Sequence, residues 1–556
     1  MANLSQIKRQ RLLDFLNQIR EEHREDDTAL IAINEIESEL NDKKYGLVWE
    51  EHQEQVDVEM LTKVPVFSEQ AEKEITADET LPYNFLLEGD NLHSLKLLEK
   101  THKGKIDVIY IDPPYNTGKK DFRYNDTFVE QEDNFRHSKW MSFIHKRMEI
   151  SKSLLRENGI IFVSVDDNEF SAMKLLLDDI YGEDNRVATL VWKKRYQGAK
   201  EKHIVVCHEY LLMYCKDKSL LPTLFVPSDE EYAKKYFKQS DEYGLYRTQP
   251  LEAGKSMDDR ENLRFPITAP DGSEILPKRQ WIWSKEHVEQ GIEKHIIGFS
   301  QNKQGEWNVF IKQYLNDESG EQRKTKQFSI IDGIYTQHGT KEIESIFGDG
   351  NVFKFPKPTN LICKVLDIVP FERNFTVLDF FAGSGTTAHA VMNYNSTHKD
   401  CNSRFILCTN NENGICEDIT YQRIKTVITG KRKDGSDYSD GISANLKYYK
   451  TDFIDKTSED EEYSVGEELL GHIAEMVQLE YAVRLDGKNY VLLLSDIDAD
   501  TFIADDEKLS VCSAVYVSTA VLLTAEQEKK LSELGIAIFV IPDYYFENEL
   551  LEVGER

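Results

Sequence analysis

Four consecutive residues, Asp112-Pro113-Pro114-Tyr115, follow directly after an apolar run at 106–111. The lone pair of an exocyclic base amine is delocalised into the ring, so hydrogen-bond acceptors on its two N–H bonds help the nitrogen to attack a methyl donor. The Asp112 carboxylate would supply one acceptor, and the carbonyl of Pro113, made rigid by Pro114, would supply the second. Tyr115 offers a ring face for an unstacked base. The tetrapeptide therefore suits methyl transfer to a base amine, although Pro-Pro can also simply end a strand.

A glycine-rich turn at 381–387, Phe-Ala-Gly-Ser-Gly-Thr-Thr, follows a second apolar run and opens a helix. Glycines let the backbone come close to a ligand, and the N-terminus of a helix presents free N–H groups. The turn is not a phosphate loop, because no lysine follows it. Asp379, at the end of the preceding strand, suits a ligand that carries an ammonium group. Taken alone, the pattern also fits a tight structural turn.

The apolar pattern places both loops at the ends of strands. Continuous apolar runs predict buried strands, and apolar residues at helical spacing predict the helices between them. Strands are expected at 106–111, 159–165, 208–214, 376–380 and 405–408, and helices at 140–155, 173–180 and 386–392. This alternation predicts an α/β fold with a Rossmann-like, doubly wound and mostly parallel sheet. Ligands of such sheets bind beyond the carboxyl ends of the strands, where both loops lie.

The rest of the chain differs from this alternating pattern. Residues 1–60 have apolar residues at helical spacing, and the last hundred residues predict a small α/β unit. The unit would contain a helix at 467–479 and strands at 490–494, 511–517 and 536–541. Between about 216 and 345 the alternation stops, which predicts an inserted domain with its own fold. A chain of 556 residues is too long for one core, so three or four domains are expected.

Charge is distributed unevenly along the chain. The formal net charge is -31. Residues 1–85 hold 9 Lys and Arg against 20 Asp and Glu, and residues 451–556 hold 7 against 25. The middle of the chain is therefore almost neutral, and its stretch 186–220 has 8 basic against 3 acidic residues. This distribution is compatible with nucleic-acid binding by the middle and with protein contacts by the ends.

The N-terminal segment, the length of the apolar runs and the cysteine spacing bear on the location of the protein and on metal binding. The first ten residues lack the apolar segment of a signal peptide, and no apolar run approaches the length of a membrane span. We therefore expect a cytoplasmic protein. The seven cysteines form no CxxC pair, so reduced thiols are expected and no metal site.

The two loops together resemble the modification subunits of type III restriction–modification systems, which are β-class DNA adenine-N6 methyltransferases. The resemblance rests on Tyr110-Ile-Asp-Pro-Pro-Tyr-Asn-Thr-Gly118 and on Leu378-Asp-Phe-Phe-Ala-Gly-Ser-Gly-Thr-Thr-Ala-His389. Weaker matches are at 88–92, 159–166, 208–210 and 355–361, so the resemblance covers about 86 to 425. In the β arrangement the catalytic motif precedes the cofactor motif and the target recognition domain lies between them, as here.

The resemblance implies a class I methyltransferase sheet, S-adenosylmethionine as the cofactor and the following site residues. The catalytic residues would be Asp112, Pro113, Pro114 and Tyr115. The cofactor-binding residues would be Asp379, Phe381, Gly383, Gly385, Thr386, Lys357, Pro358, Asp90, Asn116 and Glu412. Asp90 fits a helix N-cap equally well, and Glu412 stands where the family's ribose-binding acid is offset or replaced.

The same resemblance implies DNA contacts and a domain order. Candidate DNA-binding residues are Lys193, Lys194, Arg195, Tyr210, Lys278 and Arg279. Tyr210 fits a buried strand tyrosine as well. The expected boundaries are 1–80 for a helical N-terminal region, 81–215 for the catalytic half of the core, 216–345 for target recognition, 346–445 for the cofactor half and 446–556 for an acidic domain that contacts a second copy or a partner.

Partners and alternatives follow from the family. Double-stranded DNA, a second copy of the chain and a separate helicase–nuclease subunit are the implied partners. The sequence leaves open a solitary DNA adenine methyltransferase, and a non-catalytic DNA-binding specificity subunit is the alternative from a different class. Cytosine-N4 methyltransferases use similar chemistry, but their tetrapeptide usually begins with Ser, so Asp112 favours adenine. An RNA substrate is a further alternative.

Overall fold

The computed structural model divides the chain into two compact units. The first comprises Met1–Leu220, Ser329–Cys363 and Phe371–Arg556, and the second comprises Leu221–Phe328 with Lys364–Pro370. The structure describes residues 4–24, 26–41, 49, 52–118, 121–124, 127–130, 132–133, 135–197, 203–227, 233, 236–255, 257–317, 320, 322–371, 374–398, 400–458, 463–541 and 545–554.

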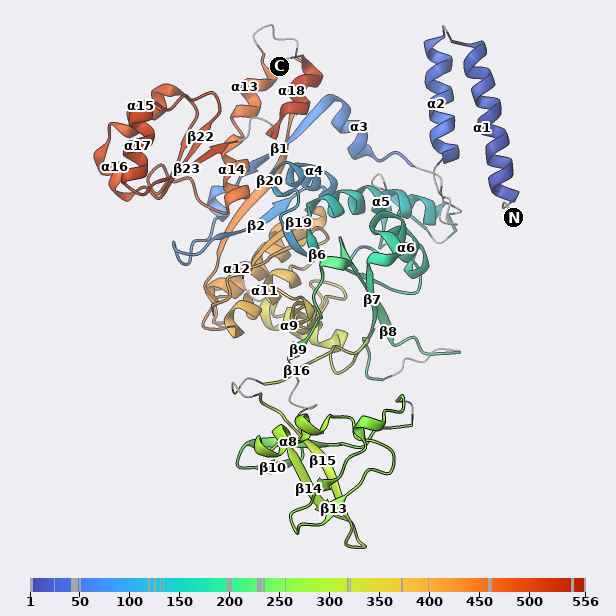
Figure 1. Ribbon diagram of the computed structural model, residues 1–556. Coiled ribbons are helices and arrows are strands. Elements are labelled where there is room, and N and C mark those ends of the chain that lie inside the picture. The colour runs from blue at the N-terminus through green and yellow to red at the C-terminus, as the bar shows by residue number, and fades with distance from the viewer. Residues whose placement is uncertain are drawn as a thin grey trace. The chain divides into compact units, whose positions relative to one another are not determined.

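The first unit contains a ten-stranded sheet with the strand order β1-β20-β2-β19-β18-β3-β6-β8-β7-β17 (Figure 1). Its strands are β1 (Lys63–Glu69), β2 (Tyr83–Glu88), β3 (Ile106–Ile111), β6 (Leu155–Val165), β7 (Arg186–Lys193), β8 (His208–Cys215), β17 (Ile330–Ile331), β18 (Thr376–Asp379), β19 (Arg404–Thr409) and β20 (Asn445–Asp455). The neighbours from β20 to β6 are parallel, whereas β1 and β8 are antiparallel to the strands that they flank. The predicted α/β fold with a mostly parallel sheet is therefore confirmed.

The central strands are buried along their whole length, as parallel strands covered on both faces must be. All six residues of β3 and all four of β18 are buried. The two strands are direct neighbours, with Val377 opposite Val108 and Leu378 opposite Ile109. Both therefore end at the same edge of the sheet, and the loops that follow them are brought together there.

Helices cover both faces of this sheet. Among the helices of the first unit are α3 (Gln55–Thr62), α4 (Asn91–His102), α5 (Arg136–Leu154), α6 (Phe170–Leu177), α9 (Thr336–Phe347), α11 (Thr386–Thr397) and α12 (Gln422–Thr429). Helix α10 (Thr359–Ile368) begins in the first unit, and its residues from Lys364 on belong to the second. The crossovers β2–α4–β3 and β3–α5–β6 run in one direction across the sheet, and β18–α11–β19 runs in the other. Because such crossovers are right-handed, α4 and α5 lie on the opposite face from α11. Helix α4 packs against α5, and α11 packs against α12.

Two strands at one edge of the sheet were not predicted. β1 contains Pro65, which an edge strand tolerates because one side of its backbone is unpaired. β20 contains Lys447, whose side chain is 1% exposed. Its ammonium group pairs with Glu69 and, at 2.8 Å, with Glu74. Because charged residues interrupt the apolar pattern of β20, only the tertiary ion pairs make it a buried strand.

The N-terminal region forms helices, as expected. Helices α1 (Leu4–Glu22) and α2 (Asp27–Asn41) make an antiparallel hairpin (Figure 1). The guanidinium of Arg20 lies 2.5 Å from the Glu37 carboxylate and 2.8 Å from the Asn34 amide oxygen across the hairpin. Further along the chain, a short hairpin of β4 (Arg123–Tyr124) and β5 (Thr127–Phe128) follows the tetrapeptide.

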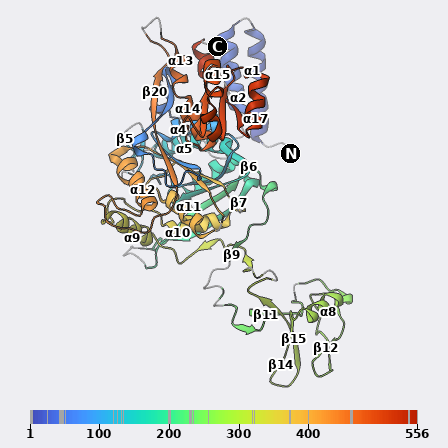
Figure 2. The same ribbon diagram turned by 90° about the vertical axis from the view of Figure 1, so that its left-hand side faces the viewer.

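The second unit has a small core of its own. Strands β10 (Gln239–Asp241), β11 (Gly244–Pro250), β15 (Trp307–Tyr314) and β14 (Ile297–Gln301) form an antiparallel sheet, and α8 (Lys285–Glu293) packs on β14 (Figure 2). Two-stranded pairs join β12 (Ile267–Thr268) to β13 (Glu274–Ile275) and β9 (Val226–Pro227) to β16 (Lys324–Thr325). Trp281 is 3% exposed and packs in this core, and its Nε1 donates to the carbonyl of Phe265.

The C-terminal part forms the expected α/β unit. Strands β21 (Tyr490–Leu493), β22 (Ala514–Ser518) and β23 (Ala537–Ile541) are parallel and are accompanied by helices α15 (Asp496–Ile503), α16 (Asp506–Val511) and α17 (Ala525–Glu533). The helix expected at 467–479 is broken into α13 (Val465–Leu470) and α14 (Ile473–Tyr481) at Gly471, because glycine weakens a helix interior. The last helix, α18 (Glu547–Val553), packs against α13. Among the described residues, no helix has the length and apolar character needed to cross a membrane.

Candidate functional site

The tetrapeptide leaves the carboxyl end of β3 and is fixed by contacts behind it. Trp140 of α5 is fully buried, and its Nε1 donates to the carbonyl of Pro114 at 2.7 Å. Asn116 turns the chain with a φ of 54°, a conformation that Asn tolerates better than most residues. Its side-chain amide donates to Glu169 at 2.6 Å inside the protein. Asn116 is thus held away from the cavity described below, and its cofactor contact stays a prediction.

The Asp112 carboxylate lies in a cluster of polar side chains from three parts of the chain. Lys357 Nζ donates to both oxygens of Asp112, at 2.8 and 2.7 Å. The Tyr115 hydroxyl donates to Asp112 at 2.7 Å and also lies 3.2 Å from Glu209 of β8. Burial, aided by the carboxylates of Asp112 and Glu209, raises the pKa of Tyr115, which keeps its phenol protonated as a donor.

The glycine-rich turn is held by Asp379, the last residue of β18. The Asp379 carboxylate accepts from the backbone N–H of Phe381 at 3.0 Å and from the Thr387 hydroxyl at 2.5 Å. Burial raises the pKa of Asp379 to about 7. Gly385 has a φ of 74°, and a Cβ there would lie 3.2 Å from the Thr420 methyl group. Glycine is therefore required both by the backbone conformation and by the close packing.

The loop that carries Lys357 is fixed against two helices. A Cβ on Gly339 of α9 would lie 2.4 Å from the carbonyl oxygen of Pro356, so only glycine allows this approach. The Thr386 hydroxyl donates to the carbonyl of Lys357 at 3.2 Å. The fully buried Arg423 of α12 donates to the Thr386 hydroxyl at 2.9 Å and to Glu342 of α9 at 3.0 Å. One guanidinium thus joins the glycine-rich turn to the Lys357 loop.

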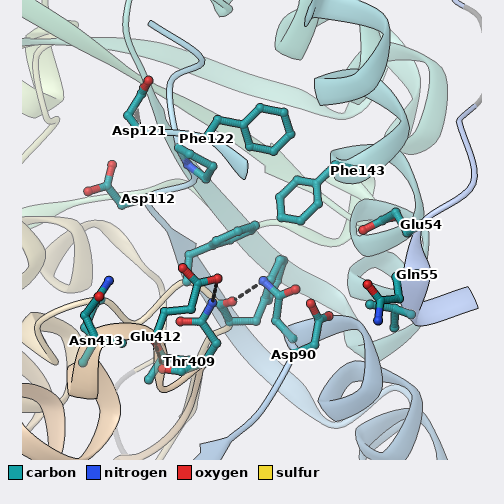
Figure 3. Close-up of a pocket in the computed structure, with 18 of the residues that line it drawn as sticks. Glu54, Gln55, Asp90, Asp112, Asp121, Phe122, Phe143, Thr409, Glu412 and Asn413 are labelled. Carbon is teal, nitrogen blue, oxygen red and sulfur yellow. Dashed lines mark hydrogen bonds between the residues drawn. The ribbon is translucent and has the colours of Figure 1, made fainter. Parts of the chain in front are cut away.

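A cavity of about 580 Å³ opens beside these loops. Figure 3 shows Asp112 and Asp121 at one end of the cavity and Glu54 with Gln55 at the other, with the rings of Phe122 and Phe143 between them. It is lined by Glu54, Gln55, Val56, Glu59, Asp90, Asn91, Asp112, Pro114, Asp121, Phe122, Phe128, Phe143, Phe380, Phe381, Gly383, Thr409, Asn410, Glu412, Asn413 and Ile415. Four predicted cofactor residues therefore line it: Asp90, Phe381, Gly383 and Glu412.

The other predicted cofactor residues lie behind the cavity wall. Asp379, Gly385, Thr386, Lys357, Pro358 and Asn116 are absent from its lining. Lys357 points to Asp112 instead, and Asp379 is 3% exposed. In this arrangement these residues shape the loops, and direct contacts between them and a cofactor stay predictions.

Asp90 is a helix N-cap, which is one of the two roles that the sequence left open, and its contact with a cofactor stays a prediction. It is the N-cap of α4, accepting from the backbone N–H of Leu92 at 2.7 Å, and it lines the cavity. Arg147 of α5 is fully buried and bonds to Asp90 at 3.2 Å and to Glu54 at 3.0 Å. This buried cation ties the segment before α3 to the turn after β2, so the N-terminal region supplies part of the cavity wall.

The lining fits S-adenosylmethionine by its chemistry. The carboxylates of Glu54, Glu59, Asp90, Asp121 and Glu412 suit a ligand that carries an ammonium and a sulfonium group, and Phe122, Phe143 and Phe381 offer apolar faces to a purine ring. Glu412 follows the carboxyl end of β19, where a carboxylate can accept from ribose hydroxyls. The volume lies within the range of ordinary small-molecule sites.

The structure pairs several predicted DNA-binding residues with other groups. Lys193 and Lys194 bond to Asp332 and Glu209, at 2.9 and 2.8 Å, whereas Arg195 is exposed. The Tyr210 ring lies 4.2 Å from that of Phe170, and its hydroxyl donates to Asp167 at 2.9 Å. In the second unit Lys278 is exposed, and Arg279 donates to two backbone carbonyls of the loop 254–257. The DNA contacts of all six residues stay predictions, and 198–202 of the basic stretch lies outside the described residues.

Three functional residues were missed from the sequence: Glu209, Arg147 and Arg423. Glu209 stands beside the predicted Tyr210, and because successive strand residues face opposite sides, it points toward Asp112 while Tyr210 does not. Arg147 stands among the apolar positions of its helix, near Ile144 and Met148. A lone cation on an apolar helix face signals a buried ion pair, and that signal was available.

Comparisons with known proteins place these motifs in a family. A family model described as DNA methylase, for N6 and N4 methyltransferases, matches residues 106–421. The chain is 33% identical over 372 residues to the type III restriction-modification enzyme StyLTI Mod subunit of Salmonella typhimurium, covering 62% of this chain and 55% of that protein. It is 32% identical over 338 residues to the type II methyltransferase M.KpnI of Klebsiella pneumoniae, covering 55% and 76%.

The chain spans a little over half the length of the type III Mod subunits that it matches. A solved structure of a putative DNA modification methylase from Thermus thermophilus, complexed with S-adenosyl-L-methionine, is 12% identical, with a TM-score of 0.28 over 58% of this chain and 87% of that one. The fold described above rests on the strand order and register of this chain alone.

Replacing Arg423 with Met should destabilise the first unit, because the change removes the cation that joins α9, α12 and the glycine-rich turn. We expect a loss of about 2–4 kcal/mol in the free energy of unfolding, measured by urea denaturation. Lys425→Met on the exposed side of the same helix is the matched control and should change it by less than about 0.5 kcal/mol. Equal stability of Arg423→Met and the parent protein would contradict this account.

Asp379 should make stability fall as pH rises through neutrality. Its pKa is about 7 in the folded chain and 3.8 ordinarily, so the folded chain binds the proton more tightly and loses that advantage between about pH 4 and 7. From pH 6 to 8 the parent should lose about 1 kcal/mol of unfolding free energy that Asp379→Asn does not lose. Urea denaturation at both pH values measures this. Asp434→Asn, at an exposed turn, should behave like the parent.

Proposed function

Because the chain belongs to the N6 and N4 family of DNA methylases, we propose that it transfers a methyl group from S-adenosylmethionine to the N6 atom of adenine in double-stranded DNA. The observation that carries this proposal is the pairing of β3 with β18, which brings Asp112-Pro113-Pro114-Tyr115 beside the glycine-rich turn at one cavity. Both loops lie within the matched region.

The chain's own residues have defined tasks in this reaction. Bound S-adenosylmethionine would supply an electrophilic methyl carbon. Asp112 and the carbonyl of Pro113 would accept from the two N–H bonds of the adenine amine, and Pro114, held by Trp140, keeps that carbonyl in place. Tyr115 would offer its ring to the flipped base. Asp90, Phe381, Gly383 and Glu412 would hold the cofactor, and Phe122 and Phe143 would exclude water from it.

The wider assignment is the modification and specificity subunit of a type III restriction–modification system. It is supported by identity to Mod subunits over more than half of this chain. The part of the second unit at Leu221–Phe328, within the predicted range 216–345, would read the DNA target. The acidic ends would contact a second copy and a separate helicase–nuclease subunit. A solitary adenine methyltransferase is the second candidate, supported by the identity to the type II enzyme M.KpnI.

Incubation of the protein with genomic DNA and labelled S-adenosylmethionine, followed by single-molecule mapping of modified bases, tests the proposal. We expect N6-methyladenine in one fixed sequence context. Methylation of cytosine N4 alone would contradict the choice of base, and no methylation under conditions where the protein binds the cofactor would contradict the activity.

Asp112→Asn should lower kcat by about 100-fold or more, because an amide of the same shape is a weaker acceptor and offers a donor to the amine. Single-turnover methylation of DNA measures this loss. Asp133→Asn, a carboxylate on the loop before α5 and absent from the cavity lining, is the control and should retain parental kcat. Comparable rates for Asp112→Asn and the parent would remove Asp112 from the catalytic site.

A further inference from the structure

Four buried or partly buried side chains of alternating charge lead from Lys194, directly after β7, to the tetrapeptide loop. Lys194 Nζ lies 2.8 Å from Glu209 Oε1, and Lys357 Nζ lies 3.4 Å from Glu209 Oε2. Lys357 Nζ then lies 2.7 Å from Asp112 Oδ2. The side chains of Lys357 and Glu209 are each 10% exposed. Glu209 thus has one oxygen fixed by Lys194, and its other oxygen faces the ammonium group that is bonded to Asp112.

This arrangement conflicts with the substrate's need for Asp112. Both carboxylate oxygens accept from Lys357, and one of them also accepts from Tyr115. An adenine amino group is an N–H donor that needs one of the same oxygens. An ammonium group is the stronger donor of the two, since a charge assists its hydrogen bond. Three of the roughly four acceptor positions of Asp112 are taken, two of them by Lys357, so the base must compete with the ammonium group for this carboxylate.

We propose, on the basis of the proposed function, that Lys357 occupies acceptor positions of Asp112 that the substrate amino group needs. When the base enters, Lys357 gives up a hydrogen bond to Asp112 and forms one to Glu209 instead. Glu209 is then a positioning residue for the methyl transfer. The ammonium needs to move by less than about 1 Å to bring its 3.4 Å contact with Glu209 to hydrogen-bond length, which the flexible stem of a lysine permits.

The ion pair between Lys357 and Asp112 also has a role in the free protein. An unpaired carboxylate in this partly buried site would be costly, and an ammonium group beside it offsets that cost. Burial opposes the charged forms of both Lys357 and Glu209, but the opposite charges outweigh it, so the pKa of Lys357 is raised and the pKa of Glu209 is lowered. The other ionisable groups that face the cluster are Tyr110, Tyr115, Asp166 and Asp379.

A double-mutant cycle with Glu209→Gln and Lys357→Met tests this inference. A neutral Gln cannot draw the ammonium away from Asp112, so Glu209→Gln should lower kcat by about 10- to 100-fold while the Kd for S-adenosylmethionine changes by less than about threefold. Adding Lys357→Met removes the competitor, so the double variant should be at least about fivefold faster than Glu209→Gln.

Asp178→Asn is the matched control for a buried carboxylate near the other end of β8. Asp178 bonds to Lys174 at 2.5 Å and accepts from the Tyr214 hydroxyl at 2.6 Å, so it has the same kinds of partner without contact to the site. If Asp178→Asn lowers kcat, adding Lys357→Met should not restore it. Glu209→Asp keeps the charge for Lys194 but shortens the reach to Lys357, and it replaces Glu209→Gln if that variant does not fold.

The outcomes separate this inference from the proposed function. If the parent methylates DNA but the double variant is no faster than Glu209→Gln, the exchange of Lys357 between the two carboxylates is excluded and Glu209 has only a structural role. If relief by Lys357→Met appears while the Kd for S-adenosylmethionine stays within about threefold of the parent value, the inference holds. A parent that binds the cofactor and methylates no DNA contradicts the proposed function itself.

Discussion

The pairing of β3 with β18 is the constraint on which the site depends. The two strands are more than 260 residues apart in the chain, yet Val108 and Val377 are opposite each other in the sheet. Because parallel strands end at the same edge of the sheet, this pairing by itself brings the tetrapeptide close to the glycine-rich turn. A slip of one residue would exchange the two faces of β18 and move Asp379 away from the turn that it holds.

Buried cations connect the loops around the site, as backbone hydrogen bonds connect the strands of the sheet. Arg147 joins the segment before α3 to Asp90, and Arg423 joins α9 to the glycine-rich turn. Each guanidinium has several carboxylate or hydroxyl partners, as a buried charge requires. The same rule applies to Lys357, whose partners are Asp112, Tyr115 and Glu209. In the proposed exchange, the contact of Lys357 with Asp112 stabilises the free protein and is rearranged for the reaction.

The cavity, the two ends of the chain and its middle differ in their content of charged residues. The cavity is lined by carboxylates, which suits a cationic cofactor, although most of the chain's excess of acidic residues lies outside it, at the two ends. The near-neutral middle is where DNA is proposed to bind. Lys193 and Lys194 are paired with carboxylates in this structure, so their engagement of phosphates would require those pairs to open.

The sequence by itself determined the central strands of the sheet and the two loops that follow β3 and β18, because apolar runs and Gly and Pro act locally. It also identified Asp90, Phe381, Gly383 and Glu412, which line the cavity. Only the tertiary structure decided that Lys357 bonds to Asp112, that Glu209 rather than Tyr210 faces the site, and that β20 joins the sheet. Those outcomes depend on ion pairs between residues far apart in the chain, which no local pattern records.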